Sequence, residues 1–252
     1  MKGLGPLIGV LGGMGPLATA DFMKRLTRLT VASRDQDHYR TLTVSNPRVP
    51  DRSEAILGHG PSPLPGLLEG IALLERNGAD VIVIPCNTAH YWLDELEAAT
   101  RVPILSIFDA VGRDLERFGV KSGAIGILGT PGTVKSGIYQ RHLAAVGYST
   151  LEPTEQELAN DVEPAIRAVK AGDIEAGTRF AVRAVDALEA KGAIAIVLGC
   201  TELPLAVSEI RSAAGAPIID STASLARASI EWAAAHEAAA PAAVGEMLSD
   251  PA

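Results

Sequence analysis

The chain contains two cysteines, and they are the residues best suited to chemistry because their surroundings match. Cys86 follows the apolar run 81–84 and a proline, and Cys200 follows a second apolar run and a glycine. Such runs are typical of β-strands buried on both faces. Asn87 and Thr88, good helix N-cap residues, come directly after the first cysteine. The sequence therefore predicts each thiol at the carboxyl end of a strand, before a helix whose dipole favours the thiolate.

Two thiols that approach one ligand from opposite sides suit the inversion of a stereocentre. One group removes a proton from one face, the other supplies a proton to the opposite face, and like groups allow both directions. The cysteines are 200 − 86 = 114 residues apart, unlike the Cys-x-x-Cys spacing of redox pairs. The five histidines (38, 59, 90, 142 and 236) show no ligand spacing, so we predict no metal site. A small buried hydrophobe is the alternative role of a cysteine, but two cysteines in the same position disfavour it.

The elements that must position the thiols occur twice. Gly12 lies 86 − 12 = 74 residues before Cys86, and Leu128 lies 200 − 128 = 72 residues before Cys200. Each cysteine is also 17 residues from a Pro-Ile pair, since 103 − 86 = 17 and 217 − 200 = 17. Each half should thus contain a strand, a glycine turn and a helix, then a strand with its cysteine and a helix, then a further strand. We predict an α/β fold of two pseudo-symmetric domains with mainly parallel sheets flanked by helices, and an active site in the cleft between them.

The domain boundaries follow from this repeat. We expect the first domain in residues 1–112 plus 212–235, the second in 113–211, and a loosely held alanine-rich tail in 236–252. Strands are expected at 7–11, 40–45, 81–84, 103–107, 124–128, before Cys200 and from 218. Helices are expected at 17–33, 67–77, 110–118, after the glycine turn 129–133, and at 162–170, 173–191 and 224–235, with a loop or flap at 58–66. The glycine turns lack a P-loop lysine and an acidic ribose partner, which argues against nucleotide binding.

Composition excludes several classes of function. The chain has 252 residues, a formal charge of −8, 47% hydrophobic and 21% charged residues, which describes a soluble globular protein. The absence of a basic stripe argues against a nucleic-acid partner. We find no apolar run of membrane-spanning length and no signal segment. With so few cysteines, we expect a reduced, cytoplasmic protein.

Arg52 is a candidate for binding an acidic ligand. It lies in a segment that Pro47 and Pro50 keep extended and stiff. Held over a site, its guanidinium would clamp a carboxylate. A solvated surface arginine is the alternative.

Five motifs together resemble the aspartate/glutamate racemase family: residues 11–16, 50–52, 85–90, 129–133 and 199–204. The resemblance implies cofactor-independent racemisation of an acidic amino acid and a protein that commonly dimerises. Carried over by motif, Cys86 and Cys200 would be the acid and base. The resemblance further implies an α-carboxylate held by Asn87, Thr88 and Ala89, a side-chain carboxylate held by Arg52 and Lys170, and substrate contacts from Met14, Thr130, Thr201 and Glu202.

Three positions refine this resemblance. Ile166 stands where aspartate-specific members tend to carry a tyrosine, and Met14 and Glu202 stand where cell-wall glutamate racemases carry other residues. This places the chain with the aspartate branch or a broad-specificity one. Glu202 would support Cys200 as a thiol, or simply be an acid near a helix N-terminus. The alternatives are a hydantoin racemase, a one-cysteine decarboxylase or isomerase relative, and a non-catalytic binder of an acidic metabolite.

Overall fold

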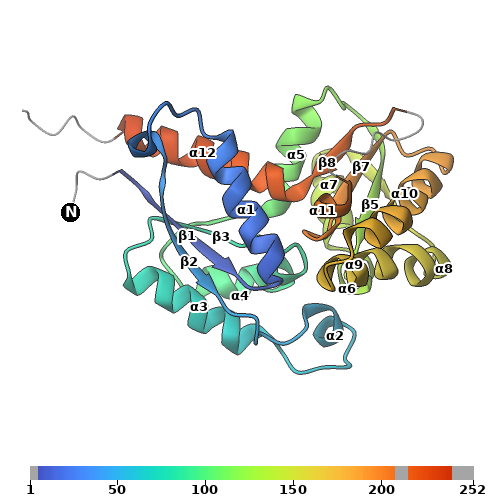
Figure 1. Cartoon of the computed structure of the whole chain (residues 1–252), viewed down its shortest axis with the longest axis horizontal. Helices are drawn as coiled ribbons and strands as arrows, with labels where there is room; N and C mark the ends of the chain where they lie inside the picture. The colour runs from blue at the N-terminus through green and yellow to red at the C-terminus, as the bar shows by residue number, and fades with distance from the viewer. Residues whose placement is uncertain (1–4, 208–214, 240–252) are drawn as a thin grey trace, which may run out of the picture.

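A computed structural model describes residues 5–207 and 215–239 of the chain, and within them two parallel sheets of four strands each. The first has the order β2-β1-β3-β4 and the second the order β6-β5-β7-β8, so the same topology occurs twice. The strands of the first sheet are β1 (Leu7–Gly12), β2 (Arg40–Ser45), β3 (Val81–Val83) and β4 (Ile104–Leu105). Those of the second are β5 (Gly123–Gly129), β6 (Tyr148–Leu151), β7 (Ala195–Gly199) and β8 (Ile218–Asp220). The predicted α/β fold with mainly parallel sheets is confirmed, and the two lobes lie beside each other in Figure 1.

Helices flank both sheets. Those of the first lobe are α1 (Pro16–Leu29), α2 (Arg52–Ile56), α3 (Leu64–Arg76) and α4 (Leu93–Ala98), with short 3₁₀ helices at Asp35–Asp37 and Thr88–Trp92. The second lobe has α6 (Pro131–Lys135), α7 (Ile138–Ala145), α8 (Glu155–Glu157), a π-helical turn at Leu158–Val162, α9 (Glu163–Lys170), α10 (Ile174–Ala190) and α11 (Leu203–Val207). Two further helices, α5 (Ile107–Arg117) and α12 (Ser221–Ala239), connect the lobes. None of the helices in the described ranges is long and apolar enough to span a bilayer.

The first sheet is covered on both faces, as Figure 1 shows for α1 and α12 on one side and α3 on the other. Alternate residues of the β3 segment accordingly enter different cores, with Val81 and Val83 in one and Ile82 and Ile84 in the other. The first of these cores also contains Ile125 and Ile127 of β5 and residues of α5 and α12. A continuous hydrophobic core therefore joins the lobes and holds the two sheets in a fixed relation.

Several expected elements differ from those observed. The helix expected after the second glycine turn is two helices, because Gly137 between α6 and α7 takes the left-handed conformation with φ = 65°. The edge strand β6 was not expected at all. Helix α12 continues to Ala239, so residues 236–239 of the expected tail are helical, and residues 240–252 lie outside the described residues.

The division into domains remains a prediction, with one difference at its second boundary. Strand β8 was expected with the first domain but pairs with β7 of the second sheet. Helix α12, which follows β8 directly, packs on α1 and α5. The chain therefore crosses between the lobes within the β8–α12 connection rather than before it.

Candidate active site

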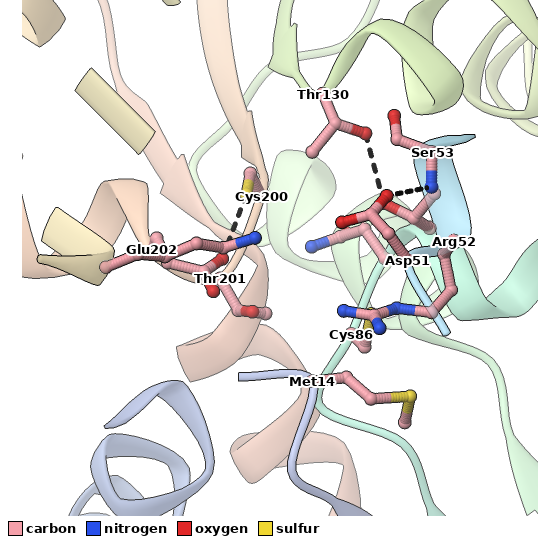
Figure 2. A pocket seen from close by; sticks show the side chains of 12 residues that line it. Met14, Asp51, Arg52, Ser53, Cys86, Thr130, Cys200, Thr201 and Glu202 are labelled. Atoms are coloured by element: carbon pink, nitrogen blue, oxygen red, sulfur yellow. Dashed lines mark hydrogen bonds between the residues drawn. The ribbon is translucent and has the colours of Figure 1, made fainter. Parts of the chain in front are cut away.

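The two cysteines occupy equivalent positions at the carboxyl ends of the sheets. Cys86 follows β3 after a tight turn in which its N–H donates to the carbonyl of Ile84 at 2.7 Å. Cys200 comes directly after Gly199, the last residue of β7. Each has only 5% of its surface exposed. A side chain at Gly199 would place its Cβ 2.9 Å from the Tyr139 ring, so only glycine fits before the second cysteine. Both thiols line the same small cavity of about 30 Å³ (Figure 2).

This cavity brings together nearly all the residues predicted for the site. Ala89 is fully buried and does not line the cavity. Asp51, the N-cap residue of α2, and Ser53, in its first turn, were not predicted. The lining residues are Met14, Asp51, Arg52, Ser53, Cys86, Asn87, Thr88, Thr130, Lys170, Cys200, Thr201 and Glu202.

Arg52 is held by its own loop in a way that leaves hydrogen-bonding capacity free. Its Nη1 donates to the carbonyl oxygens of Val49 at 3.1 Å and Pro50 at 2.8 Å. Its buried Nε has no partner among the described residues. Lys170, exposed at the end of α9, forms no ion pair within 4.0 Å in that part of the chain. Two cations therefore border the cavity with donors available for an anion.

Asn87 and Thr88 do not cap a helix, contrary to expectation, because their side chains bond across the lobes. Asn87 is 1% exposed; its Oδ1 accepts from Tyr139 Oη at 2.5 Å, and its Nδ2 donates to Ser221 Oγ at 3.0 Å. Ser221 Oγ in turn donates to the carbonyl of Leu198, two residues before Cys200, at 2.7 Å. This chain of bonds links the segments that carry the two thiols.

The hydroxyl of Thr88 also bonds to the second lobe. Its Oγ1 lies 2.8 Å from Thr133 Oγ1 and 3.2 Å from Thr130 Oγ1. Ser53 Oγ accepts from the backbone N–H of Gly132 at 2.6 Å. Segments from the two lobes thus close directly over the cavity.

The environment of Cys200 favours the thiol, as expected from Glu202 and contrary to the expectation from the helix dipole. Its Sγ donates to Glu202 Oε2 at 3.0 Å, and Glu202 is only 4% exposed. Burial, followed by the negative charge and hydrogen bond of Glu202, raises the pKa of the Cys200 thiol well above its ordinary value. The expected lowering by the helix dipole is therefore wrong for this cysteine, and Cys200 is a thiol that is able to supply a proton.

His90 supports the other cysteine and was not among the predicted site residues. Its Nδ1 lies 2.9 Å from the carbonyl of Cys86, and its Nε2 accepts from the N–H of Ile107 at 3.2 Å, which makes Nδ1 the protonated nitrogen. Burial lowers the pKa of His90 to about 4. The neutral ring therefore ties the Cys86 segment to the start of α5. The sequence offered one indication of this role, because His90 lies four residues after Cys86.

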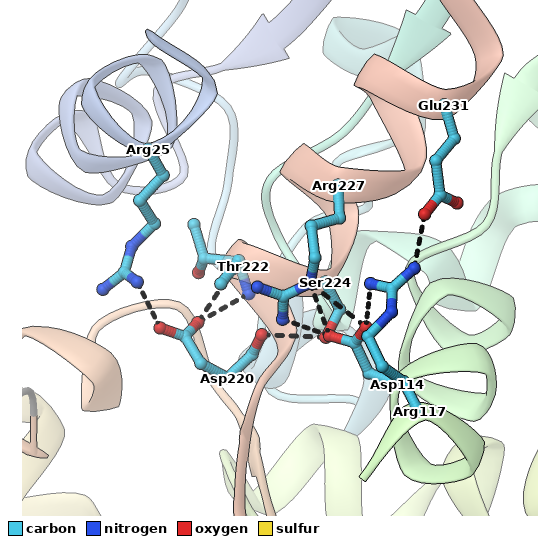
Figure 3. Close-up of polar contacts among 9 residues, drawn as sticks. Arg25, Asp114, Arg117, Asp220, Thr222, Ser224, Arg227 and Glu231 are labelled. Atoms are coloured by element: carbon cyan, nitrogen blue, oxygen red, sulfur yellow. Dashed lines mark hydrogen bonds and ion pairs between the residues drawn. The ribbon is translucent and has the colours of Figure 1, made fainter. Parts of the chain in front are cut away.

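A cluster of ion pairs around the buried Asp114 fixes α5 against α12 (Figure 3). The carboxylate of Asp114, with 2% of its side chain exposed, accepts from Ser224 Oγ at 2.6 Å and pairs with Arg227. Arg117 bridges Asp114 at 2.8 Å and Glu231 at 2.5 Å. Because these two helices connect the lobes, the cluster stabilises the relative position of the sheets that carry the thiols.

A larger cavity adjoins the small one. The small cavity has room for about two water molecules and is too small for an amino acid. The adjoining cavity of about 500 Å³ shares Asp51, Arg52, Lys170 and Glu202 with it. Its other walls come from the first glycine turn, the proline segment and α9: Gly13, Gly15, Pro16, Leu17, Pro47, Val49 and Val169. The outer cavity therefore adjoins the thiols on the side of these four shared residues.

Comparisons with known proteins agree with this geometry. A family model described as Asp/Glu/hydantoin racemase matches residues 11–229, which include both cysteines. The chain is 29% identical over 235 residues to the broad specificity amino-acid racemase RacX of Bacillus subtilis (strain 168), covering 92% of this chain and 100% of that protein. It is 36% identical over 163 residues to a glutamate racemase of Corynebacterium diphtheriae, covering 62% of this chain and 59% of that protein. The solved structure of Picrophilus torridus aspartate racemase matches with a TM-score of 0.80 at 34% identity, covering 91% of this chain and 95% of that one.

Proposed function

The chain belongs to the Asp/Glu/hydantoin racemase family, and we propose that it interconverts the L and D forms of an acidic amino acid, aspartate or glutamate. One observation carries the proposal: the only two thiols of the chain, from equivalent positions of two parallel sheets, line one cavity. Such a pair supplies a base and an acid without help from another group.

The two thiols have distinct roles in each direction. When Cys86 starts as the thiolate, it takes the proton from Cα, so that the Cα–H bond breaks and an S–H bond forms. The Cys200 thiol gives its proton to the opposite face of Cα and becomes the thiolate. The reverse reaction begins from that state, so protons balance over a cycle. The hydrogen bond from Cys200 to Glu202 favours the first state in the free protein.

The charges around the cavity support an acidic substrate. A dicarboxylic amino acid brings a second negative charge into a closed site, where an unpaired carboxylate is costly. Arg52 and Lys170 border the cavity with free donors. Two of the similar proteins are named aspartate racemase and glutamate racemase. We assign these cations to the side-chain carboxylate of the substrate.

Broad specificity is the second candidate, and the outer cavity favours it. About 500 Å³ of space lies beyond Arg52 and Lys170, more than aspartate would fill. Ile166, where a tyrosine is typical of aspartate-specific relatives, is buried at 5% exposure and adds no polar contact. The relative matched over its whole length is named a broad specificity racemase. Side chains longer than that of aspartate would then extend into the outer cavity.

The test is exchange of the α-proton. The purified protein is incubated in D₂O with each amino acid; loss of the α-proton is recorded by NMR, and the enantiomers are separated by chiral chromatography. Aspartate or glutamate should exchange and racemise, and Cys86→Ser and Cys200→Ser should each lose nearly all racemisation. Activity should survive EDTA and dialysis, since we expect no cofactor. Binding of aspartate without exchange would identify a non-catalytic binder, and wild-type activity in either serine variant would exclude the two-thiol mechanism.

We further propose a cytoplasmic homodimer whose partner is a small acidic metabolite, with no nucleic-acid or membrane partner. The formal charge of −8 supports the absence of a nucleic-acid partner, and the dimer is what the resemblance to the racemase family implies. Light scattering after size-exclusion chromatography measures the assembly, and a monomeric mass at micromolar concentration would exclude the dimer.

A further inference from the structure

Glu202 is a buried acid with one oxygen unused. Only 4% of its surface is exposed, and its Oε2 accepts from the thiol of Cys200 at 3.0 Å. Its Oε1 is buried and has no hydrogen-bond partner within the described ranges. A buried carboxylate oxygen without a donor is unfavourable. This orphaned acceptor therefore points to a ligand that brings a donor.

Gly15 of the first glycine turn lies next to that oxygen, because it has no side chain. A Cβ placed on Gly15 would lie 3.2 Å from Glu202 Oε1 and would meet no other heavy atom within 4 Å. Gly15 lines the outer cavity, while Glu202 lies on the walls of both cavities. The orphaned oxygen thus lies between the second lobe and the glycine turn of the first, on a residue that borders both cavities.

The neighbouring cations do not satisfy this oxygen. Over residues 5–207 and 215–239, neither Arg52 nor Lys170 forms an ion pair with Glu202 within 4.0 Å. Asp51, the other acid on the cavity wall, is already used, since its Oδ1 accepts from the backbone N–H groups of Ser53 at 2.8 Å and Glu54 at 3.0 Å. Of these two acids, Glu202 is the one with a buried oxygen that lacks a hydrogen-bond partner within the described residues.

We propose that Glu202 Oε1 binds the α-ammonium group of the substrate, in the space beside Gly15; this inference rests on the proposed racemase function. Every amino acid brings an ammonium group as its strongest donor, whereas the carboxylates of the substrate have Arg52 and Lys170. A charge-assisted hydrogen bond to a buried carboxylate is strong and directional. The assignment makes Glu202 the residue that distinguishes amino acids from other dicarboxylates.

The same contact would couple substrate binding to proton transfer. In the free protein, the charge of Glu202 is one cause of the raised pKa of Cys200. A bound ammonium offsets that charge, so the thiol becomes a better proton donor only when an amino acid is present. The contact also keeps the amine protonated, which makes the adjacent Cα–H more acidic.

The test combines a change in the protein with a change in the ligand. Isothermal titration calorimetry measures binding of racemic aspartate, whose composition catalysis leaves unchanged, and of succinate, which is aspartate without its amine. Glu202→Gln should weaken binding of aspartate by about 10-fold or more, the usual effect of losing a charged hydrogen bond. Succinate should bind with the same affinity within about twofold, or more tightly, because a negative charge has been removed.

Two further variants make the result specific. Asp51→Asn removes the same charge from an acid that has other partners. It should therefore change the affinities for aspartate and for succinate by the same factor. Gly15→Ala fills the space beside Oε1 of Glu202, so it should weaken the binding of aspartate more than the binding of succinate. Melting temperatures by circular dichroism verify that each variant is folded.

The outcomes separate this inference from the proposed function. Equal weakening of aspartate and succinate by Glu202→Gln, in a wild-type protein that exchanges the α-proton in D₂O, would overturn the ammonium site alone. It would assign Glu202 to the thiol of Cys200 only. If the wild-type protein neither binds aspartate nor exchanges its α-proton, the racemase function falls and the ammonium site falls with it.

Discussion

The hydroxyl of Tyr139 tests whether the bonds between the lobes position the thiols. The side chain is fully buried, and its Oη donates to Asn87 Oδ1 at 2.5 Å, next to Cys86. Burial raises the pKa of Tyr139 far above its ordinary value, so the phenol remains a donor at every working pH. Tyr139→Phe removes this donor while keeping the ring, and leaves the oxygen of Asn87 buried and unsatisfied.

The magnitude follows from that orphaned oxygen. An unsatisfied buried acceptor costs about 1–3 kcal/mol of unfolding free energy, which corresponds to a decrease of roughly 2 to 10 °C in melting temperature for a chain of this size. Catalysis should suffer further, because Asn87 is then free to turn and to displace the Cys86 segment. A displacement of about 1 Å at reacting groups reduces rates up to about 100-fold, so we expect kcat/KM to fall about 10- to 100-fold.

Tyr148 offers a matched control. It is buried, and its Oη donates to the carbonyl of Val120 at 2.5 Å, but it does not line either cavity at the thiols. The melting temperature of Tyr148→Phe should therefore decrease by a similar amount, while its kcat/KM should stay that of the wild-type protein. Differential scanning calorimetry and initial rates from both enantiomers measure the two effects. If Tyr139→Phe and Tyr148→Phe lose stability alike and retain equal activity, the bonds between the lobes do not position the thiols.

Three further predictions follow from the charged groups. Arg52→Ala and Lys170→Ala should each lower kcat/KM for aspartate or glutamate by a factor equivalent to about 2–4 kcal/mol of transition-state stabilisation. The loss should be much smaller for alanine if it reacts, and equal losses for acidic and neutral substrates would assign both residues to the fold. The pKa of His90 is lowered from 6.5 to about 4, so the unfolded chain binds a proton in this range that the native state does not. Urea unfolding should thus show stability falling by roughly 3 kcal/mol from pH 6.5 to pH 4, with a smaller fall in His90→Gln; identical pH dependence in both proteins would contradict this. Asp114→Asn should lose about 1–3 kcal/mol of unfolding free energy, because Ser224 and two partly exposed arginines lose their buried charged acceptor. Glu175→Gln, which alters an exposed pair, should lose less than about 0.5 kcal/mol; similar losses would refute the role of the cluster.

The fold could be predicted largely because it is a repeat. The spacing from each glycine turn to its cysteine and from each cysteine to its Pro-Ile pair places equivalent elements at equivalent distances. Parallel strands buried on both faces give uninterrupted apolar runs, which β3 and β7 display. The edge strand β6 was missed because three of its four residues, Tyr148–Leu151, are not fully buried and the apolar signal is weak.

The site could be predicted only as far as its local signals extend. The motifs place the thiols and the cations, but the partners of Asn87 lie 52 and 134 residues away in the sequence. The local sequence favours a helix cap for that side chain. In the structure the side chain instead forms tertiary hydrogen bonds, which no local sequence pattern predicts. The error for the pKa of Cys200 has a similar origin. A helix dipole contributes about 0.3–1 kcal/mol, whereas burial shifts a pKa by up to about 3–5 units.

Symmetry between the lobes is broken where the chemistry takes place. Thr88 stands two positions after Cys86. The equivalent position after Cys200 is occupied by Glu202, whose carboxylate accepts from the thiol. The free protein should therefore hold Cys200 as the thiol, and the enantiomer whose α-proton faces Cys86 should bind to the abundant form. The other enantiomer needs the rarer form with a Cys200 thiolate, so its KM should be larger.

Thermodynamics sets the remaining parameter. Because the two enantiomers have equal free energies, the equilibrium constant is one, and their kcat/KM values must be equal. The enantiomer with the larger KM must therefore also have the larger kcat, by the same factor. Glu202→Gln should bring the two KM values together, since it removes the charge that makes the thiols unequal, even if both values rise. Initial rates followed from pure L and pure D substrate measure all four constants. Equal KM values for the two enantiomers in the wild-type protein would show that Glu202 does not bias the thiols, whatever its effect on the overall rate.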